Sequence, residues 1–121
     1  MPDLPANFAA WFARKGWELH PHQADLLAYA TEPATLLIAP TGGGKTLAGF
    51  LPTLVELAAT PHKGMHTLYV SPLKALTADI RRNLGSPITD LGLPIRVEDR
   101  TGDTSYTKRQ RQRADPPDIL L

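Results

Sequence analysis

The first third of the chain places its apolar residues at helical spacing. Residues 7–15 carry an apolar stripe at positions i, i+3 and i+4, formed by Phe8, Trp11 and Phe12. This spacing predicts a helix over 7–15, with Asn7 as its cap and Gly16 as its end. Pro21 suits the first position of a helix, where its missing N–H is not needed, and predicts a second helix through about residue 30.

The pattern changes in the next segment. Residues 34–39 form a short apolar run between two prolines, which predicts a buried strand. Residues 46–59 return to helical spacing and predict an amphipathic helix. Pro52 lies inside this helix and should kink it or interrupt one turn.

The second half alternates the two periods. Short apolar runs predict strands over 66–70, 95–98 and 118–121. Between them, Ser71 and Pro72 open a predicted helix that reaches about residue 84, and a polar helix is expected over about 105–114. Strands that alternate with helices are usually joined by right-handed crossovers into a parallel sheet. The predicted fold class is therefore α/β.

The composition limits the class of protein without indicating a function. The chain has 121 residues, 42% of them hydrophobic, which is enough for one domain with a core. No apolar run approaches the roughly 18 residues that a membrane helix needs, and the N-terminus lacks the pattern of a secretory signal. Cysteine is absent. These features favour a cytoplasmic protein without disulfides.

Charge is unevenly distributed although the net charge is only +1. Residues 100–113 carry a local charge of +4, because they include five basic residues and one acidic residue, Asp103. The basic residues are Arg100, Lys108, Arg109, Arg111 and Arg113. Such a segment either contacts phosphates or forms a solvated helix face. Both alternatives remain open at this point.

The segment Ala39–Thr46 has the sequence APTGGGKT and follows the phosphate-loop pattern, with Ala39 in place of the usual first glycine. Phosphate oxygens must approach the backbone closely, and a Cβ would obstruct them. We expect Lys45 to reach the β- and γ-phosphates of a nucleotide, and the Thr46 hydroxyl to ligate Mg²⁺. The predicted site comprises Ala39, Pro40, Thr41, Gly42, Gly43, Gly44, Lys45 and Thr46.

This motif does not specify how the nucleotide is used, since kinases, transporters, GTPases and helicases share it. A small-molecule kinase would also need acceptor-binding residues and a lid after the third strand. A module that binds nucleic acid under the control of ATP is a second alternative. His62 and His66 have ligand-like spacing, but Gly64 separates them and no cysteine or carboxylate pair joins them, so no zinc site is predicted.

Three further features narrow the choice: Gln23 ahead of the first strand, the run YVSPLKAL over 69–76, and the run RTGDT over 100–104. In this order, together with APTGGGKT, they resemble superfamily 2 helicases of the DExH-box group, specifically the Lhr-like and ligase-associated DNA helicases. The similarity extends over nearly the whole chain. It implies a RecA-like three-layer domain that binds ATP and Mg²⁺.

The resemblance assigns roles to residues outside the phosphate loop. Gln23 matches the glutamine that reads the adenine edge, since a carboxamide can donate and accept hydrogen bonds at once. Trp17 is a candidate for stacking on the base. Two segments match motifs that hold the backbone of single-stranded DNA without reading its sequence. Together with the basic Arg109, the implied nucleic-acid contacts are Ser71, Pro72, Lys74, Ala75, Thr101, Gly102, Asp103 and Thr104.

The same family places an acidic Asp-Glu-x-His motif after these segments, and 1–121 contains none. We therefore expect 1–121 to be the N-terminal part of the first RecA-like domain, truncated before that motif. The parent protein is expected to be an ATP-dependent DNA helicase or translocase, whose partners are single-stranded DNA and the remainder of its own motor. The residues 1–121 alone are expected to bind ATP without appreciable turnover.

Overall fold

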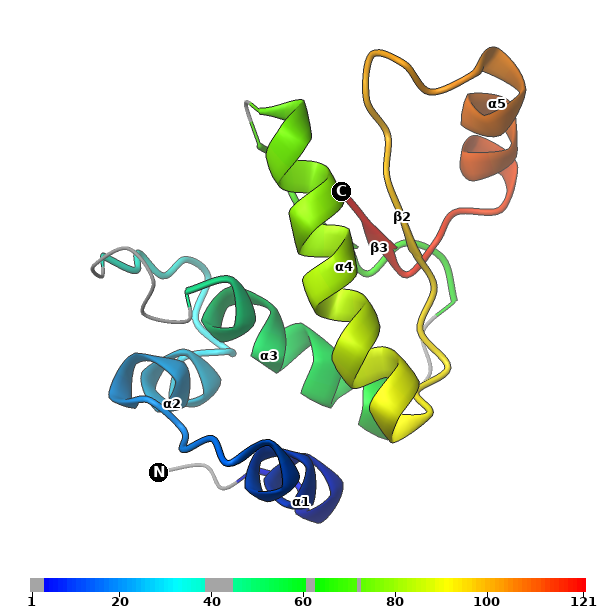
Figure 1. The fold of residues 1–121 in the computed structure, drawn as a ribbon. Coiled ribbons are helices and arrows are strands. Elements are labelled where there is room, and N and C mark those ends of the chain that lie inside the picture. Colours follow the sequence, from blue (N-terminus) through cyan, green and yellow to red (C-terminus); the bar gives the residue numbers. More distant parts are fainter. Residues whose placement is uncertain (1–3, 39–44, 61–62, 72) are drawn as a thin grey trace. The chain divides into compact units, whose positions relative to one another are not determined.

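The computed structural model describes residues 4–38, 45–60, 63–71 and 73–121 (Figure 1). The chain divides into two compact units, Met1–Glu56 and Leu57–Leu121, and each is described by itself. Among the described residues, none of the helices combines the length and the apolar character needed to cross a membrane.

The first unit begins with helices α1 (Ala6–Lys15) and α2 (Pro21–Ala28), as the apolar spacing predicts. The stripe of Phe8, Trp11 and Phe12 is buried. Gly16 ends α1 in the left-handed conformation at φ 70°, which glycine adopts without steric cost. The predicted cap is wrong, because Pro5 holds the cap position and Asn7 lies inside the helix.

The strand expected over 34–39 is not formed in its described part, residues 34–38. Leu36 and Ile38 are 83% and 85% exposed rather than buried. A strand is defined by its hydrogen-bonded neighbours, and no described segment pairs with these residues. An apolar run alone is therefore not enough to form a strand at residues 34–38.

Helix α3 (Lys45–Ala59) follows the glycine run and matches the predicted span. Pro52 lies inside it, and the helix continues on both sides of the proline. The helix stays in place because its apolar positions are packed, with Leu51, Leu54 and Leu57 all buried. Tertiary packing can outweigh the one hydrogen bond that a proline removes.

The second unit contains a parallel sheet in the order β1-β3-β2, which confirms the α/β class. Strand β3 (Ile119–Leu120) lies between β1 (Thr67–Leu68) and β2 (Val97–Glu98). Ile119 is paired with both Thr67 and Val97. The strands are shorter than the predicted runs, and the fully buried Ile119 lies at the centre of the sheet.

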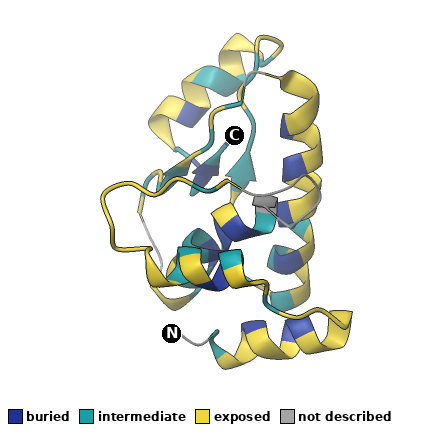
Figure 2. Ribbon diagram, turned by 90° about the vertical axis from the view of Figure 1, so that its left-hand side faces the viewer, coloured by how far each residue is buried: buried dark blue, intermediate teal, exposed yellow. Residues whose placement is uncertain are grey.

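Helix α4 (Lys74–Leu91) connects β1 to β2 and packs against β2. It begins at Lys74 and continues well beyond the predicted end near residue 84. Its buried positions, coloured in Figure 2, are Thr77, Ile80, Leu84 and Pro87. This stripe runs through the proline, so burial of the continuous face outweighs the helix-breaking tendency of Pro87.

Helix α5 (Tyr106–Ala114) connects β2 to β3 and agrees with the predicted polar helix. Ser105 caps it, since its hydroxyl accepts a hydrogen bond from the Lys108 backbone N–H at 3.2 Å. Its one buried residue is Gln112, whose Nε2 donates to the carbonyl oxygen of Asp99 at 3.0 Å. A polar side chain therefore anchors α5 to the end of β2.

Candidate nucleic-acid interface

Two of the motifs predicted from the sequence leave the sheet at the same edge. The strands β1 and β2 are both parallel to β3, so their carboxyl ends point in one direction. Ser71 and Lys74 follow β1, and the turn Thr101–Thr104 follows β2. The edge beyond the carboxyl ends of parallel strands is where α/β folds most often bind ligands.

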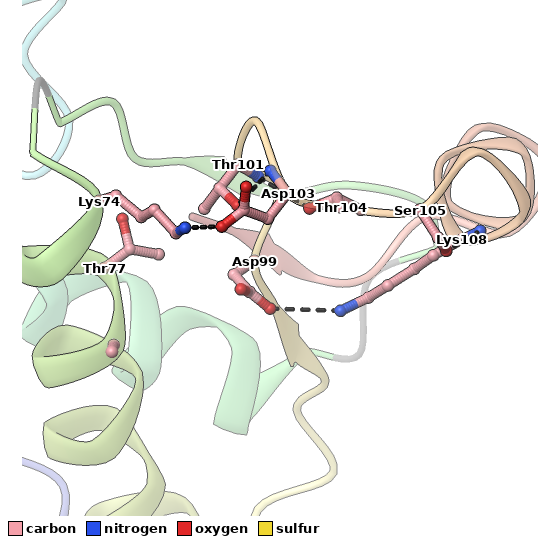
Figure 3. A pocket seen from close by; sticks show the side chains of 9 residues that line it. Lys74, Thr77, Asp99, Thr101, Asp103, Thr104, Ser105 and Lys108 are labelled. Atoms are coloured by element: carbon pink, nitrogen blue, oxygen red, sulfur yellow. Dashed lines mark hydrogen bonds and ion pairs between the residues drawn. The ribbon is translucent and has the colours of Figure 1, made fainter.

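An ion pair joins the two motifs directly. The Nζ of Lys74, at the start of α4, contacts the carboxylate of Asp103 in the turn after β2 (Figure 3). Both side chains are exposed, at 62% and 72%. Segments about thirty residues apart along the sequence are therefore brought into direct contact.

The turn itself is held by hydroxyl groups. The Thr104 Oγ1 accepts a hydrogen bond from the Thr101 backbone N–H at 2.8 Å, and the Thr101 Oγ1 accepts one from the Asp103 N–H at 3.2 Å. The Nη2 of Arg109 donates to the carbonyl oxygen of Thr101 at 2.8 Å. Two of the predicted contact residues thus shape the turn, and a third attaches it to α5.

On the other motif, Ser71 takes part in a tight turn before α4. Its hydroxyl accepts a hydrogen bond from the Leu73 backbone N–H at 3.3 Å. Ala75 is exposed on the first turn of α4. Pro72, which completes this predicted set, lies outside the described residues.

The basic segment of α5 is largely engaged within the second unit. Lys108 pairs with Asp99 at 3.3 Å, Arg109 contacts Thr101 as described, and Arg111 pairs with Glu98. These side chains hold α5 to the end of β2. Most of the helix is nevertheless exposed, which agrees with the solvated-face alternative, and the phosphate-binding alternative stays a prediction.

Among the acidic residues that pair with α5, Glu98 has the most strongly shifted pKa. Partial burial acts to raise its pKa, but hydrogen bonds from Arg111 and Arg96 outweigh that effect and hold the pKa at about 2. The Nη2 of Arg96 lies 3.1 Å from the Oε2 of Glu98, and its Nη1 lies 3.2 Å from the Oδ2 of Asp115. The carboxylate of Glu98 is therefore a fixed negative charge that fastens α5 to β2.

A pocket of about 310 Å³ opens beside the Lys74–Asp103 pair (Figure 3). Its lining combines hydroxyl groups with charges of both signs. The residues are Lys74, Thr77, Ala78, Asp99, Thr101, Asp103, Thr104, Ser105 and Lys108. Hydroxyl and ammonium groups are suitable partners for the phosphates and sugars of a nucleic-acid backbone.

Sequence reasoning did not single out Asp99, Thr77 or Ser105. Asp99 is central here, because it accepts from Arg81 at 3.0 Å as well as from Lys108. Partial burial favours a higher pKa, but the hydrogen bond from Lys108 prevails and the pKa of Asp99 is lowered. Its position directly after β2 was the available signal, since residues that follow parallel strands meet at one edge.

The candidates for reading the base lie in the first unit. Gln23 is 3% exposed, and its Oε1 accepts a hydrogen bond from the His20 backbone N–H at 2.9 Å. It therefore helps to cap α2 and is buried, unlike a glutamine on the solvent-exposed face of a helix. Trp17 is half exposed and packs edge to face with Trp11, with ring centroids 5.3 Å apart.

Most of the predicted phosphate loop falls outside the described residues. This holds for Ala39, Pro40, Thr41, Gly42, Gly43 and Gly44. Lys45 begins α3, and Thr46 is the next residue of that helix. The start of a helix directly after a glycine run is the local arrangement that the phosphate-loop prediction requires.

Comparison with known proteins decides the family. A family model described as DEAD/DEAH box helicase matches residues 20–121. The chain belongs to the DEAD/DEAH box helicase family. The helicase resemblance drawn from its motifs is thus confirmed, and the matched range includes every predicted site residue except Trp17.

Among curated helicases, the chain is similar to the Lhr helicase/probable uracil glycosylase of Mycolicibacterium smegmatis, with 44% identity over 92% of this chain and 8% of that protein. It is also similar to the ATP-dependent helicase Lhr-Core of Sulfolobus acidocaldarius, with 38% identity over 93% of this chain and 14% of that protein. The chain therefore spans a small part of the length of these helicases.

The chain also resembles solved helicase structures, of which two are described here. One is the structure of Mycobacterium smegmatis helicase Lhr bound to ssDNA and AMP-PNP, with a TM-score of 0.84 and 44% identity over 97% of this chain and 16% of that one. The other is the DUF1998 helicase MrfA bound to DNA and AMPPNP, with a TM-score of 0.83 and 30% identity over 99% of this chain and 17% of that one.

Proposed function

We propose that residues 1–121 are the N-terminal part of the first RecA-like domain of an ATP-dependent DNA helicase or translocase. In this proposal the chain binds ATP and the backbone of single-stranded DNA, and the remainder of the motor supplies the acidic motif and the second domain. The proposed location is the cytoplasm. Membership of the helicase family and the similarity to Lhr helicases support the proposal that these residues are part of a helicase.

The observation that carries the DNA-binding part is the meeting of Lys74 with the turn Thr101–Thr104 at one edge of the sheet. We propose that Ser71, Pro72, Lys74 and Ala75 contact the backbone from one side, and Thr101–Thr104 from the other. Arg109 would support the contact by holding the turn. Such contacts involve phosphate and sugar, so they are independent of base sequence and weaken with salt.

The nucleotide part rests on the glycine run and on the start of α3. We propose that Ala39–Lys45 surround the phosphates of ATP, that the Thr46 hydroxyl ligates Mg²⁺, and that Gln23 and Trp17 contact the base. The first turn of α3 contains no acidic residue, which suits an anion at this end of the helix. Bound Mg²⁺ would neutralise part of the phosphate charge.

DNA binding is tested by titrating labelled oligo(dT) into the longest natural polypeptide that contains these residues. Lys74→Met should weaken binding and reduce the magnitude of the slope of log K against log salt by about 1. Lys63→Met is the matched control, because Lys63 is exposed and precedes β1 at the opposite edge of the sheet. Equal affinities of the two variants would contradict the proposed interface.

ATP use is tested separately. Lys45→Ala should abolish DNA-stimulated ATP hydrolysis in the longest polypeptide. Residues 1–121 alone should retain ATP binding without appreciable hydrolysis, since an arginine finger from a second domain contributes about 10³–10⁵ in rate. DNA-stimulated hydrolysis by 1–121 that is lost in Lys45→Ala would show that the proposed division of the motor is wrong.

A further inference from the structure

The ion pair between Lys74 and Asp103 sets a condition for DNA binding. We propose that Asp103 is an intramolecular competitor that occupies Lys74 until a backbone phosphate of single-stranded DNA displaces it. This inference rests on the proposed function, because it concerns the regulation of the same interface. For Asp103 alone, this role replaces the direct backbone contact proposed above for Thr101–Thr104, because a carboxylate repels a phosphate.

The chemistry at Lys74 favours an anion. Lys74 is the first residue of α4, and the first turn of that helix contains no acidic residue. The positive end of the helix dipole and the ammonium group therefore act together, and an unpaired lysine at this position is unfavourable. In the structure, the carboxylate of Asp103 supplies the missing negative charge. A phosphate oxygen would supply the same charge.

The carboxylate of Asp103 is not needed to form its own turn. The hydroxyl groups of Thr101 and Thr104 accept the backbone hydrogen bonds of the turn, and the Thr104 N–H donates to the Thr101 carbonyl at 3.2 Å. The Asp103 side chain projects from this frame and is 72% exposed. It can thus release Lys74 while the turn stays intact.

The second carboxylate of the pocket serves as an internal comparison. Asp99 is less exposed than Asp103, at 30%, and it is paired with both Arg81 and Lys108. Its partners lie on α4 and α5, so its pairs stabilise the unit. Asp103 instead pairs with one exposed lysine, which makes it the carboxylate that a ligand can displace.

The size of the effect follows from the exposure of the pair. Exposed ion pairs contribute about 0.2–1 kcal/mol, which corresponds to roughly a 1.4- to fivefold change in an equilibrium constant. Asp103→Asn should therefore tighten binding of single-stranded DNA by up to about fivefold. The gain should shrink between about 50 and 200 mM salt, because salt screens the pair.

Removal of any negative charge favours DNA binding to some extent, so the experiment needs a matched variant. Asp79→Asn makes the same change at an exposed carboxylate that is paired with Arg82 on α4, outside the pocket. Binding of labelled oligo(dT) would be measured for Asp103→Asn, Asp79→Asn, Lys74→Met and the double variant Lys74→Met/Asp103→Asn. The longest natural polypeptide serves as the background.

The proposal expects Asp103→Asn to tighten binding more than Asp79→Asn does, and expects this excess to vanish when Lys74 is replaced. If Lys74→Met weakens binding but Asp103→Asn leaves it unchanged or weaker, the competition is refuted and the proposed interface stands. If Lys74→Met binds as tightly as Lys63→Met, both the interface and the competition are refuted.

Discussion

Arg109 donates from Nη2 to the carbonyl oxygen of Thr101 at 2.8 Å and so attaches the middle of α5 to the turn after β2. Its Nε is buried and has no hydrogen-bond partner among the described residues. A side chain predicted to face DNA therefore lies against the protein. Its contribution to DNA binding would come from holding the turn that Thr101–Thr104 forms.

Arg109→Met should lower the free energy of unfolding by about 1–3 kcal/mol, because it leaves the Thr101 carbonyl without its charged donor. DNA affinity should fall, while the slope of log K against log salt should stay unchanged. Arg113→Met, on the exposed side of the same helix, is the control and should leave stability unchanged. A slope reduced by about 1 without loss of stability would identify Arg109 as a phosphate contact instead.

Gly102 is open to a second test of the interface. A Cβ built at this position meets no atom within 4 Å, and its φ lies outside the left-handed region. The fold therefore does not need a glycine here, whereas a phosphate or sugar that approaches the backbone would. We expect Gly102→Ala to leave stability unchanged or raise it by up to about 1 kcal/mol, and to weaken binding of labelled oligo(dT) several-fold.

The control for this change is Gly85→Ala in α4, where a Cβ also meets no atom within 4 Å. It should stabilise the helix by about 0.5–1 kcal/mol and leave DNA affinity unchanged. Undiminished DNA binding by Gly102→Ala would argue against a close backbone approach at the turn.

Glu98 makes stability depend on pH. Its pKa is lowered from the ordinary 4.5 to about 2, so its pairs stabilise the folded state fully above about 4.5. As pH falls from 4.5 toward 2, the unfolded state takes up the proton first and this stabilisation is lost. Glu98→Gln should be less stable at neutral pH, and its denaturant midpoint should depend less on pH within this window.

Glu18→Gln serves as the control, since Glu18 is exposed in the first unit. It should keep the wild-type dependence between pH 4.5 and 2. If Glu98→Gln lost stability in parallel with the wild type over the same window, the carboxylate would not carry the expected stabilisation.

The helices could be predicted because their apolar spacing is a local property. All five form near the expected positions, and α4 exceeded its prediction because a buried face runs past Gly85 and through Pro87. Strand formation is not local. Residues 34–38 are as apolar as β3, but β3 has two neighbours and residues 34–38 have none among the described segments.

The site divides in the same way. The two motifs could be identified in the sequence, and their meeting at one edge follows from the parallel sheet, since parallel strands place their following residues together. The ion-pair partners of the charged residues could not be predicted. Glu98 and Asp99 precede Lys108 and Arg111 by nine to thirteen residues, and only the return of α5 against β2 pairs them. Charge composition alone therefore could not show which basic residues are paired within the protein.

Gln23 combines two roles that one substitution can separate. Gln23→Met keeps the volume but removes the acceptor for the His20 N–H, so the free energy of unfolding should fall by about 0.5–1.5 kcal/mol. If the amide also reads adenine, the preference for ATP over GTP should fall by about two- to twelvefold, the equivalent of one hydrogen bond. Competition of each nucleotide against a fluorescent ATP analogue measures this ratio.

The ratio is informative because a general loosening of α2 weakens both nucleotides alike. Leu27→Ala is the matched control, since it removes half-buried apolar contacts from the same helix without touching an amide. It should lower stability and leave the ratio unchanged. If Gln23→Met lowers stability and the ratio stays at the wild-type value, Gln23 is a capping residue of α2, and base selection must come from other residues.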